Sequence, residues 1–320
     1  MTPKEFIEYR LSELNANNKT IPKEELVNFI FKALMSKRFR KFSMTLEYQE
    51  HIKKVINESI KDNLPIKFSF PFGGYKLWRL EETPEVDWAE LFTLMYYSKW
   101  LKPICEVYKP GIIFDFASDD MIVERMNNIP KKDTQQYRES FIDLIKFLEK
   151  YIPNNLKFTF TPVSSFYNEE EFEKDLADKI EKKGKEFGGL PVLDDKKRGM
   201  VELNVKLNPD QDKDPLWREK VELMHQSYYA VDKRRPYNRA PNKILAFTYP
   251  LKDGRSISVG TTKTSVAKFW VGVGALKKRE DKFIEYILSP SQIEATKSNF
   301  EDINIEGLLG KNFNKIRIST

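Results

Sequence analysis

Residues 66–80, IKFSFPFGGYKLWRL, together with GIIFDFASDD at 111–120, decide the fold of this chain. Each segment opens with a short strand rich in phenylalanine and isoleucine, and one long apolar helix at 86–108 separates the two strands. This order predicts a parallel strand–helix–strand unit. Because ligands of open α/β sheets bind at the carboxyl ends of the strands, we expect the loops Gly73–Arg79 and Ser118–Asp120 to form an active site at one edge.

The rest of the sequence predicts helices before this unit and a mixture of helices and strands after it. Residues 1–62 are expected to form helices, and the first of these begins with the capping sequence Thr2-Pro-Lys-Glu5. Further helices are expected at 134–152, 169–185, 213–234 and 279–298. Further strands are expected at 156–162, 243–249, 256–260 and 314–319, with the turn PLKDG joining the second and third of these as an antiparallel hairpin.

These elements predict a doubly wound α/β fold with a mostly parallel sheet. We expect a helical N-terminal segment at 1–62 and an α/β catalytic domain at 63–320 with a β-rich C-terminal part. The glycines, proline and charges of 188–199 indicate an exposed loop, which is either a domain boundary or a loop within one domain.

The composition is that of a charged globular protein of 320 residues with a net charge of +6. Its basic runs, at 37–41, 182–185 and 195–199, lack the context of a nucleic-acid-binding motif. No apolar run approaches the ~20 residues that cross a bilayer, and the polar N-terminus is no signal peptide. The single cysteine, Cys105, is expected to be a buried packing residue. We therefore expect a cytoplasmic protein with neither a membrane nor a nucleic-acid partner.

Two loops carry groups that suit anion binding. In GGYKLWR, glycines follow a strand, and Lys76 and Arg79 can donate charge-assisted hydrogen bonds to a phosphate or a carboxylate. A second loop follows the strand 256–260 and packs hydroxyl and ammonium groups together, at Thr262, Lys263, Thr264 and Ser265. Beside it, Phe269 and Trp270 could wall an aromatic or apolar pocket. The alternatives are a tight turn with surface cations and an ordinary polar connection with a core tryptophan.

Acidic residues follow the same strand edge. Asp87 and Glu90 stand three residues apart in the first turn of a helix, where one would cap the helix or hold a substrate group. Ser118, Asp119 and Asp120 lie beyond the second strand. Serine and aspartate are leading helix caps, so we expect one of the three to cap the next helix and another to serve the chemistry.

The chain has two histidines and no cluster with metal-ligand spacing, so we expect no metal and no cofactor. His225 lies in MHQSYY on a helix with Tyr228 and Tyr229. It is either a structural residue or a group for proton transfer.

The segment from the glycine loop through YKPGIIFDFASDD resembles the isonitrile (isocyanide) synthases, in which a Y-x-P-G strand ends in a Ser-Asp loop. The resemblance covers about residues 65–125, with weaker agreement in KILAFTYPLKDGRSISVGTTKTS (243–265). The family's Ser-Asp-Gly is here Ser118-Asp119-Asp120. The resemblance implies a metal-free, Rossmann-like enzyme that condenses an amino acid amine with the ketone of a pentulose phosphate and fragments the adduct to leave an isonitrile.

Together, the residues and the resemblance predict an isonitrile-synthase-like enzyme acting on an amino acid and ribulose 5-phosphate. Asp119, Asp120 and His225 are its candidate catalytic residues. The candidate substrate-binding residues come from several loops and are Lys76, Arg79, Glu90, Ser118, Thr262, Lys263, Thr264, Ser265 and Trp270. The alternatives are a transferase that uses a nucleotide or a sugar phosphate, and a nucleic-acid-binding module without catalytic activity.

Overall fold

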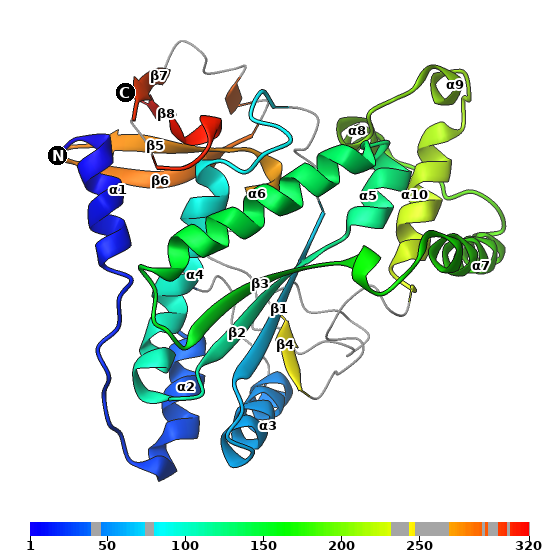
Figure 1. The fold of residues 1–320 in the computed structure, drawn as a ribbon. Helices are drawn as coiled ribbons and strands as arrows, with labels where there is room; N and C mark the ends of the chain where they lie inside the picture. The colour runs from blue at the N-terminus through cyan, green and yellow to red at the C-terminus, as the bar shows by residue number, and fades with distance from the viewer. Residues whose placement is uncertain are drawn as a thin grey trace.

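The computed structural model describes residues 1–39, 46–73, 80–231, 243–246, 269–289, 292–293, 300–305 and 308–319 (Figure 1). Within these residues the chain forms two four-stranded sheets. The first is all parallel, in the order β3-β2-β1-β4, and consists of β1 (Ile66–Phe72), β2 (Ile112–Ser118), β3 (Leu156–Pro162) and β4 (Ile244–Ala246). The second is mixed, in the order β6-β5-β8-β7, and consists of β5 (Val273–Arg279), β6 (Lys282–Leu288), β7 (Phe300–Asn304) and β8 (Lys315–Ser319). The predicted α/β class with a β-rich C-terminal part is confirmed.

Phenylalanines hold the first sheet to the helices α4 (Trp88–Val107) and α6 (Lys131–Glu149). Strands β1, β2 and β3 each place phenylalanine at alternate positions, so these rings share one face of the sheet. That row consists of Phe68, Phe70, Phe72, Phe114, Phe116, Phe158 and Phe160. It packs against Tyr97 of α4 and Phe141 of α6, with ring centroids 4.6 Å apart for Tyr97 and Phe114 and 5.1 Å apart for Phe116 and Phe141.

The N-terminal helices contact different parts of this body. Helix α1 (Pro3–Ser12) lies against β6, where Phe6 meets Phe283 and Arg10 pairs with Glu285 at 2.7 Å. Helix α2 (Leu26–Leu34) packs on α4, and α3 (Leu46–Lys61) lies beside β1 and β4. Their apolar side chains belong to the same core as the first sheet.

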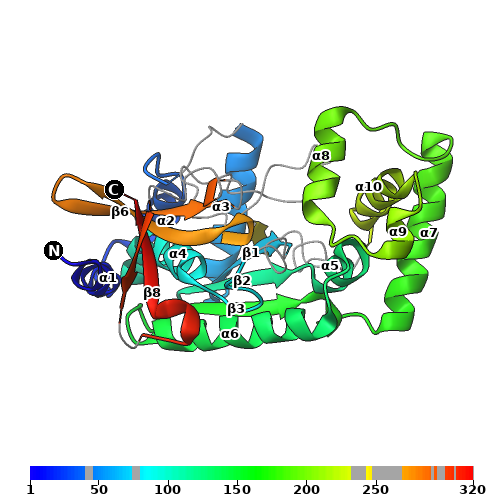
Figure 2. The ribbon, with the colours of Figure 1, turned by 90° about the horizontal axis from the view of Figure 1, so that it is seen from above.

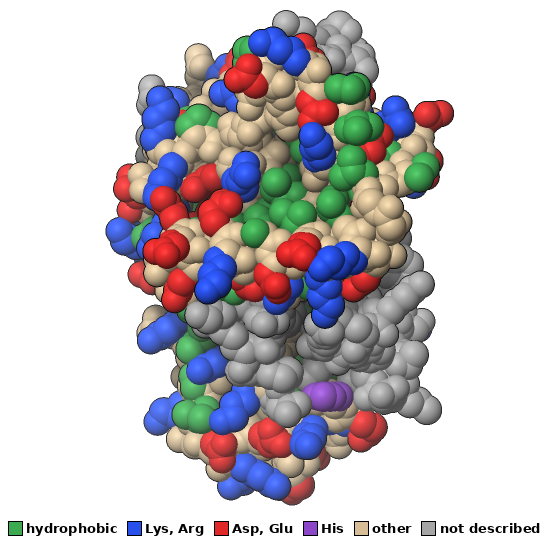
Figure 3. Space-filling model, turned by 90° about the vertical axis from the view of Figure 1, so that its right-hand side faces the viewer, with side chains coloured by type: hydrophobic (Ala, Val, Ile, Leu, Met, Phe, Trp, Pro, Cys, Tyr) green, Lys and Arg blue, Asp and Glu red, His purple; other side chains and the backbone are tan. Residues whose placement is uncertain are grey.

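Four helices between β3 and β4 form a separate lobe at the carboxyl end of the first sheet (Figure 2). We call residues 169–231 the helical insert; it contains α7 (Glu169–Phe187), α8 (Asp195–Asn204), α9 (Pro209–Asp212) and α10 (Trp217–Tyr228). It meets the body where α10 contacts α5 (Asp120–Asn127). Figure 3 shows this side of the molecule, with hydrophobic side chains near the centre between charged ones.

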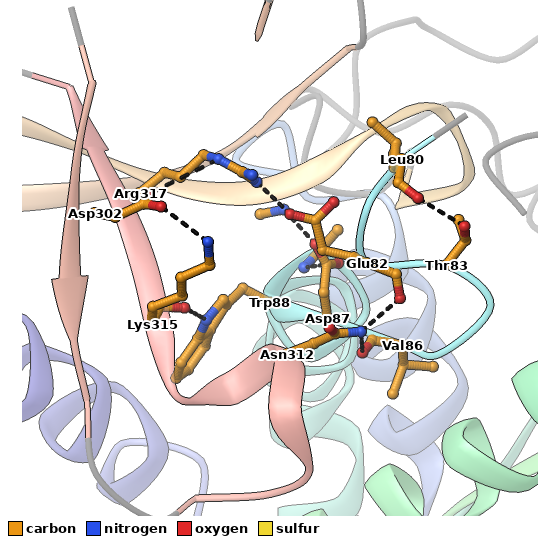
Figure 4. Close-up of polar contacts among 12 residues, drawn as sticks. Leu80, Glu82, Thr83, Val86, Asp87, Trp88, Asp302, Asn312, Lys315 and Arg317 are labelled. Atoms are coloured by element: carbon orange, nitrogen blue, oxygen red, sulfur yellow. Dashed lines mark hydrogen bonds and ion pairs between the residues drawn. The ribbon is translucent and has the colours of Figure 1, made fainter. Parts of the chain in front are cut away.

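The second sheet is fastened to the loop that leads into α4 (Figure 4). The carboxylate of Asp87 caps α4 through the Ala89 amide at 2.9 Å and also accepts the amide of Gly274 in β5 at 3.2 Å. Gly274 has to be glycine, because a Cβ there would lie 2.4 Å from the Ala89 nitrogen. The Trp88 indole donates to the Lys315 carbonyl at 2.7 Å, and Arg317 of β8 pairs with Glu82 of the loop.

Two sequence predictions about elements are wrong. The helix expected at 279–298 begins instead with the end of β5 and then β6, which form an antiparallel hairpin turning at Glu280 (φ 54°) and Asp281. The loop expected at 188–199 ends early, because Asp194 accepts the Lys197 amide at 2.7 Å and so caps α8. The expected hairpin partner at 256–260 lies outside the described residues.

Burial of Cys105 is confirmed. Its side chain lies in the core on α4, and this burial raises the pKa of the thiol to about 12.

Candidate functional site

The carboxyl ends of the first three strands lie level with one another. Phe72 of β1 pairs in register with Ser118 of β2, and Ser118 pairs with Pro162 of β3. In the sheet order, β1 lies between β2 on one side and β4 on the other, so the strand order reverses its direction at β1. Such a switch point and its carboxyl edge are where open α/β sheets bind ligands. The two loops predicted to share one edge therefore do start from the same edge.

The loop after β1 is described only at its first residue, Gly73, which is buried. The predicted anion-binding residues Lys76 and Arg79 lie outside the described residues, as do Thr262, Lys263, Thr264 and Ser265 of the second polar loop. Their roles remain predictions.

The loop after β2 is held to both of its neighbours. The Asp119 amide donates to the Phe72 carbonyl of β1 at 2.9 Å. Asp119 stands at the N-cap position of α5 but makes no side-chain capping bond. Its carboxylate, 9% exposed, accepts instead the hydroxyl of Tyr228 from α10 at 2.6 Å. Asp119 thus ties the strand edge to the helical insert.

Asp120, the first residue of α5, faces the end of β3. Its two carboxylate oxygens accept the Ser164 amide at 3.2 Å and the Ser164 hydroxyl at 2.5 Å. Burial raises the pKa of Asp120 despite these hydrogen bonds. A carboxyl with a raised pKa at a strand end is a candidate acid or base.

A cavity of about 230 Å³ opens beside Asp120, between α5, α6 and the segment after β3. Ser118 also lines it, which places two of the predicted site residues together. One turn along α5, Glu124 accepts the hydroxyl of Thr134 from α6. Burial raises the pKa of Glu124, and the nearby Asp120 carboxylate adds to the rise. The cavity therefore contains three carboxyls, those of Asp120, Glu124 and Glu169, and the first two resist being ionised together.

Helix α6 contributes cations to the cavity lining. Lys131, Thr134 and Arg138 of α6 are spaced three and four residues apart, so they share one face of the helix, and all three line the cavity. Lys131 pairs with Glu169 at the start of α7. Within the described part of the chain, Arg138 forms no ion pair.

Glu90 is held inside the protein. It is completely buried, accepts the Asp87 amide at 2.9 Å to complete a capping box, and accepts the Tyr137 hydroxyl at 2.8 Å. The geometry supports the capping alternative for both Asp87 and Glu90. Substrate binding by Glu90 remains an untested prediction.

The structure places the other two predicted residues away from the cavity lining. His225 lies on α10 with its Nδ1 3.7 Å from Glu222 and its ring 4.9 Å from that of Tyr229. Trp270 is half-buried against Phe70, with ring centroids 5.4 Å apart. Its neighbour Phe269 is fully buried in the core, so it cannot wall an open pocket.

The residues of this region that the sequence did not predict are Glu124, Lys131, Thr134, Arg138, Ser164, Glu169 and Tyr228. Only Glu124 had a local signal, since it stands four residues after Asp120 and shares its helix face. The others come from segments that are distant in sequence.

Two features of other functional classes are not found in the described residues. No helix there is both long and apolar enough to span a membrane. No group of three His, Cys, Asp or Glu side chains is placed there to hold a metal ion.

Comparisons by sequence give no relative: no family model matches the chain, and no curated protein does. The structure is similar to the crystal structure of the PvcA protein from Pseudomonas aeruginosa, with a TM-score of 0.62 and 13% sequence identity. The match covers 92% of this chain and 100% of that chain. The two proteins thus share a fold over most of this chain.

Proposed function

We propose that this protein is an isonitrile-synthase-like enzyme. It would condense the amine of an amino acid with the ketone of ribulose 5-phosphate and fragment the adduct to leave an isonitrile. The observation that carries this proposal is the segment YKPGIIFDFASDD (108–120). It contains β2, and its Asp119 and Asp120 follow β2 at the carboxyl edge of a parallel sheet. The likeness to PvcA supports it, since it suggests an isonitrile-synthase-like fold along most of the chain.

In this proposal the loops at the carboxyl edge of the sheet have different roles in substrate binding and proton transfer. Lys76 and Arg79 bind an anionic group of one substrate, and Lys263 with its hydroxyl neighbours binds the sugar phosphate. Asp120, whose pKa is raised, exchanges protons with the amine or a sugar hydroxyl. Asp119 holds the edge in place through Tyr228.

The experiment that tests this function is a product screen. The purified protein is incubated with ribulose 5-phosphate and each common amino acid in turn. We expect one amino acid, or a few, to give an isonitrile, detected by its mass and by its reaction with a tetrazine. Asp120→Asn should lower the turnover at saturating substrate.

A screen without any isonitrile, alongside clear turnover of a nucleotide sugar, would replace this proposal with the transferase. Nucleic-acid binding that falls steeply with salt, with no turnover of either kind, would instead support a binding module.

A further inference from the structure

We infer that the cavity between α5 and α6 is the subsite for a free α-amino acid, with Asp120 and Glu124 binding its ammonium group and Arg138 its carboxylate. This inference rests on the proposed function and goes beyond it, because it gives a location and individual partners to one of the two substrates.

The arrangement of charge in the cavity suits a free amino acid. Asp120 and Glu124 are four residues apart on α5, so they share one face of the helix, and both line the cavity. Arg138 lines the same cavity from α6. A free amino acid carries one positive and one negative group separated by a single carbon atom, so it matches a small cavity with acidic and basic walls.

Within the described residues, neither Asp120 nor Glu124 forms an ion pair, although the charge of Lys131 acts on both. Lys131 is already paired with Glu169, and neutral hydroxyls are the partners of both acids: Ser164 for Asp120 and Thr134 for Glu124. Burial raises the pKa of both, and their mutual repulsion adds to the rise for Glu124. An ammonium ion between them would offset this repulsion, with three N–H donors for carboxylate oxygens.

The size and the lining of the cavity also suit a free amino acid. Pockets for drug-sized ligands hold about 300–1,000 Å³. This cavity, at about 230 Å³, suits a smaller molecule. Its other walls come from Met121, Phe160, Pro162 and Tyr167, which offer apolar surface for a side chain. A phosphate alone would leave this apolar surface unused and would meet three carboxylates, those of Asp120, Glu124 and Glu169.

The test measures binding by calorimetry, separately from turnover. Each common amino acid is titrated into the full-length protein. The tightest binder is then compared with two analogues, the primary amine that lacks its carboxylate and the carboxylic acid that lacks its amine. Wild type should prefer the amino acid to both analogues.

Glu124→Gln should weaken binding of the amino acid about 10- to 100-fold, the range for one charge-assisted hydrogen bond. Glu124→Gln should also reduce the preference of the protein for the amino acid over the carboxylic acid that lacks the amine. Arg138→Gln should weaken binding of the amino acid to a similar extent. It should instead reduce the preference for the amino acid over the primary amine that lacks the carboxylate. Two matched controls outside the cavity lining, Glu149→Gln on α6 and Arg125→Gln on α5, should bind as wild type does.

If none of the common amino acids binds the wild-type protein, the inference is overturned. The inference is also overturned if both cavity variants have native circular dichroism spectra and bind the amino acid as tightly as wild type does. If isonitrile forms but the variants behave as wild type, the subsite is wrong and the proposed function stands. If the variants behave as expected but no isonitrile forms, the subsite stands and the proposed reaction is wrong.

Discussion

At the scale of single residues, two tyrosine–carboxylate hydrogen bonds differ in their surroundings. Tyr228 donates to Asp119 at 2.6 Å inside the protein, whereas Tyr9 donates to Glu13 at 3.2 Å on an exposed part of α1. Removing a donor costs most where water cannot replace it. The buried hydroxyl should therefore matter more to folding than the exposed one.

We predict that Tyr228→Phe lowers the free energy of unfolding by about 1–3 kcal/mol. Tyr9→Phe, the matched control, should change it by less than about 0.5 kcal/mol. Urea unfolding followed by circular dichroism measures both. Equal effects of the two substitutions would show that the bond to Asp119 does not hold the helical insert to the strand edge.

Glu222 gives a prediction for pH. Burial favours its protonated form, but hydrogen bonds from His225, Gln226 and Lys197 outweigh burial and lower its pKa from the ordinary 4.5 to about 2. A lowered pKa stabilises the folded state above pH 4.5, and this stability is lost as the pH falls toward 2. Its contribution should be on the order of 2 kcal/mol.

Glu222→Gln should therefore lower stability at neutral pH and flatten its fall in acid. Urea unfolding of wild type and variant across this pH range provides the measurement. Parallel pH profiles for the two proteins would contradict the assignment.

At the scale of elements, the described residues contain two capping boxes in different settings. Thr2 and Glu5 cap α1 on the surface, whereas Asp87 and Glu90 cap α4 inside the protein. The carboxylate of Asp87 also accepts the amide of Gly274. Its loss would leave a helix end uncapped and remove one of the hydrogen bonds that hold the second sheet to the start of α4.

We predict that Asp87→Ala destabilises the protein by roughly 1–3 kcal/mol more than Thr2→Ala does. Thermal unfolding of the two variants beside wild type makes the comparison. A similar loss in both would mean that the contact with Gly274 contributes nothing to stability.

The sequence predicted elements well where the pattern was local. Phenylalanines at alternate positions identified β1, β2 and β3, and a capping sequence identified α1. The hairpin β5–β6 was missed, because Phe283, Tyr286 and Ile287 have spacings that also suit a helix face. Its two strands pair with each other along their length, and β5 also pairs with β8 from about forty positions later in the chain.

At the scale of the whole molecule, the site was predictable only in part. Ser118, Asp119 and Asp120 could be found because they directly follow a recognisable strand. Arg138 and Ser164 could not, because helix α6 and the end of β3 bring them to the cavity through the fold. Lys76, Arg79 and the 262–265 loop lie outside the described residues, so their place at this edge stays a prediction.

The central claim is that the nitrogen of an amino acid and the ketone carbon of ribulose 5-phosphate become the isonitrile group. The most direct measurement uses an amino acid labelled with ¹⁵N and ribulose 5-phosphate labelled with ¹³C at its ketone carbon. We predict a product that is heavier by one mass unit for each label, in which both labels stay in the isonitrile after fragmentation. A product without the sugar label, or no isonitrile with any common amino acid, would contradict the account.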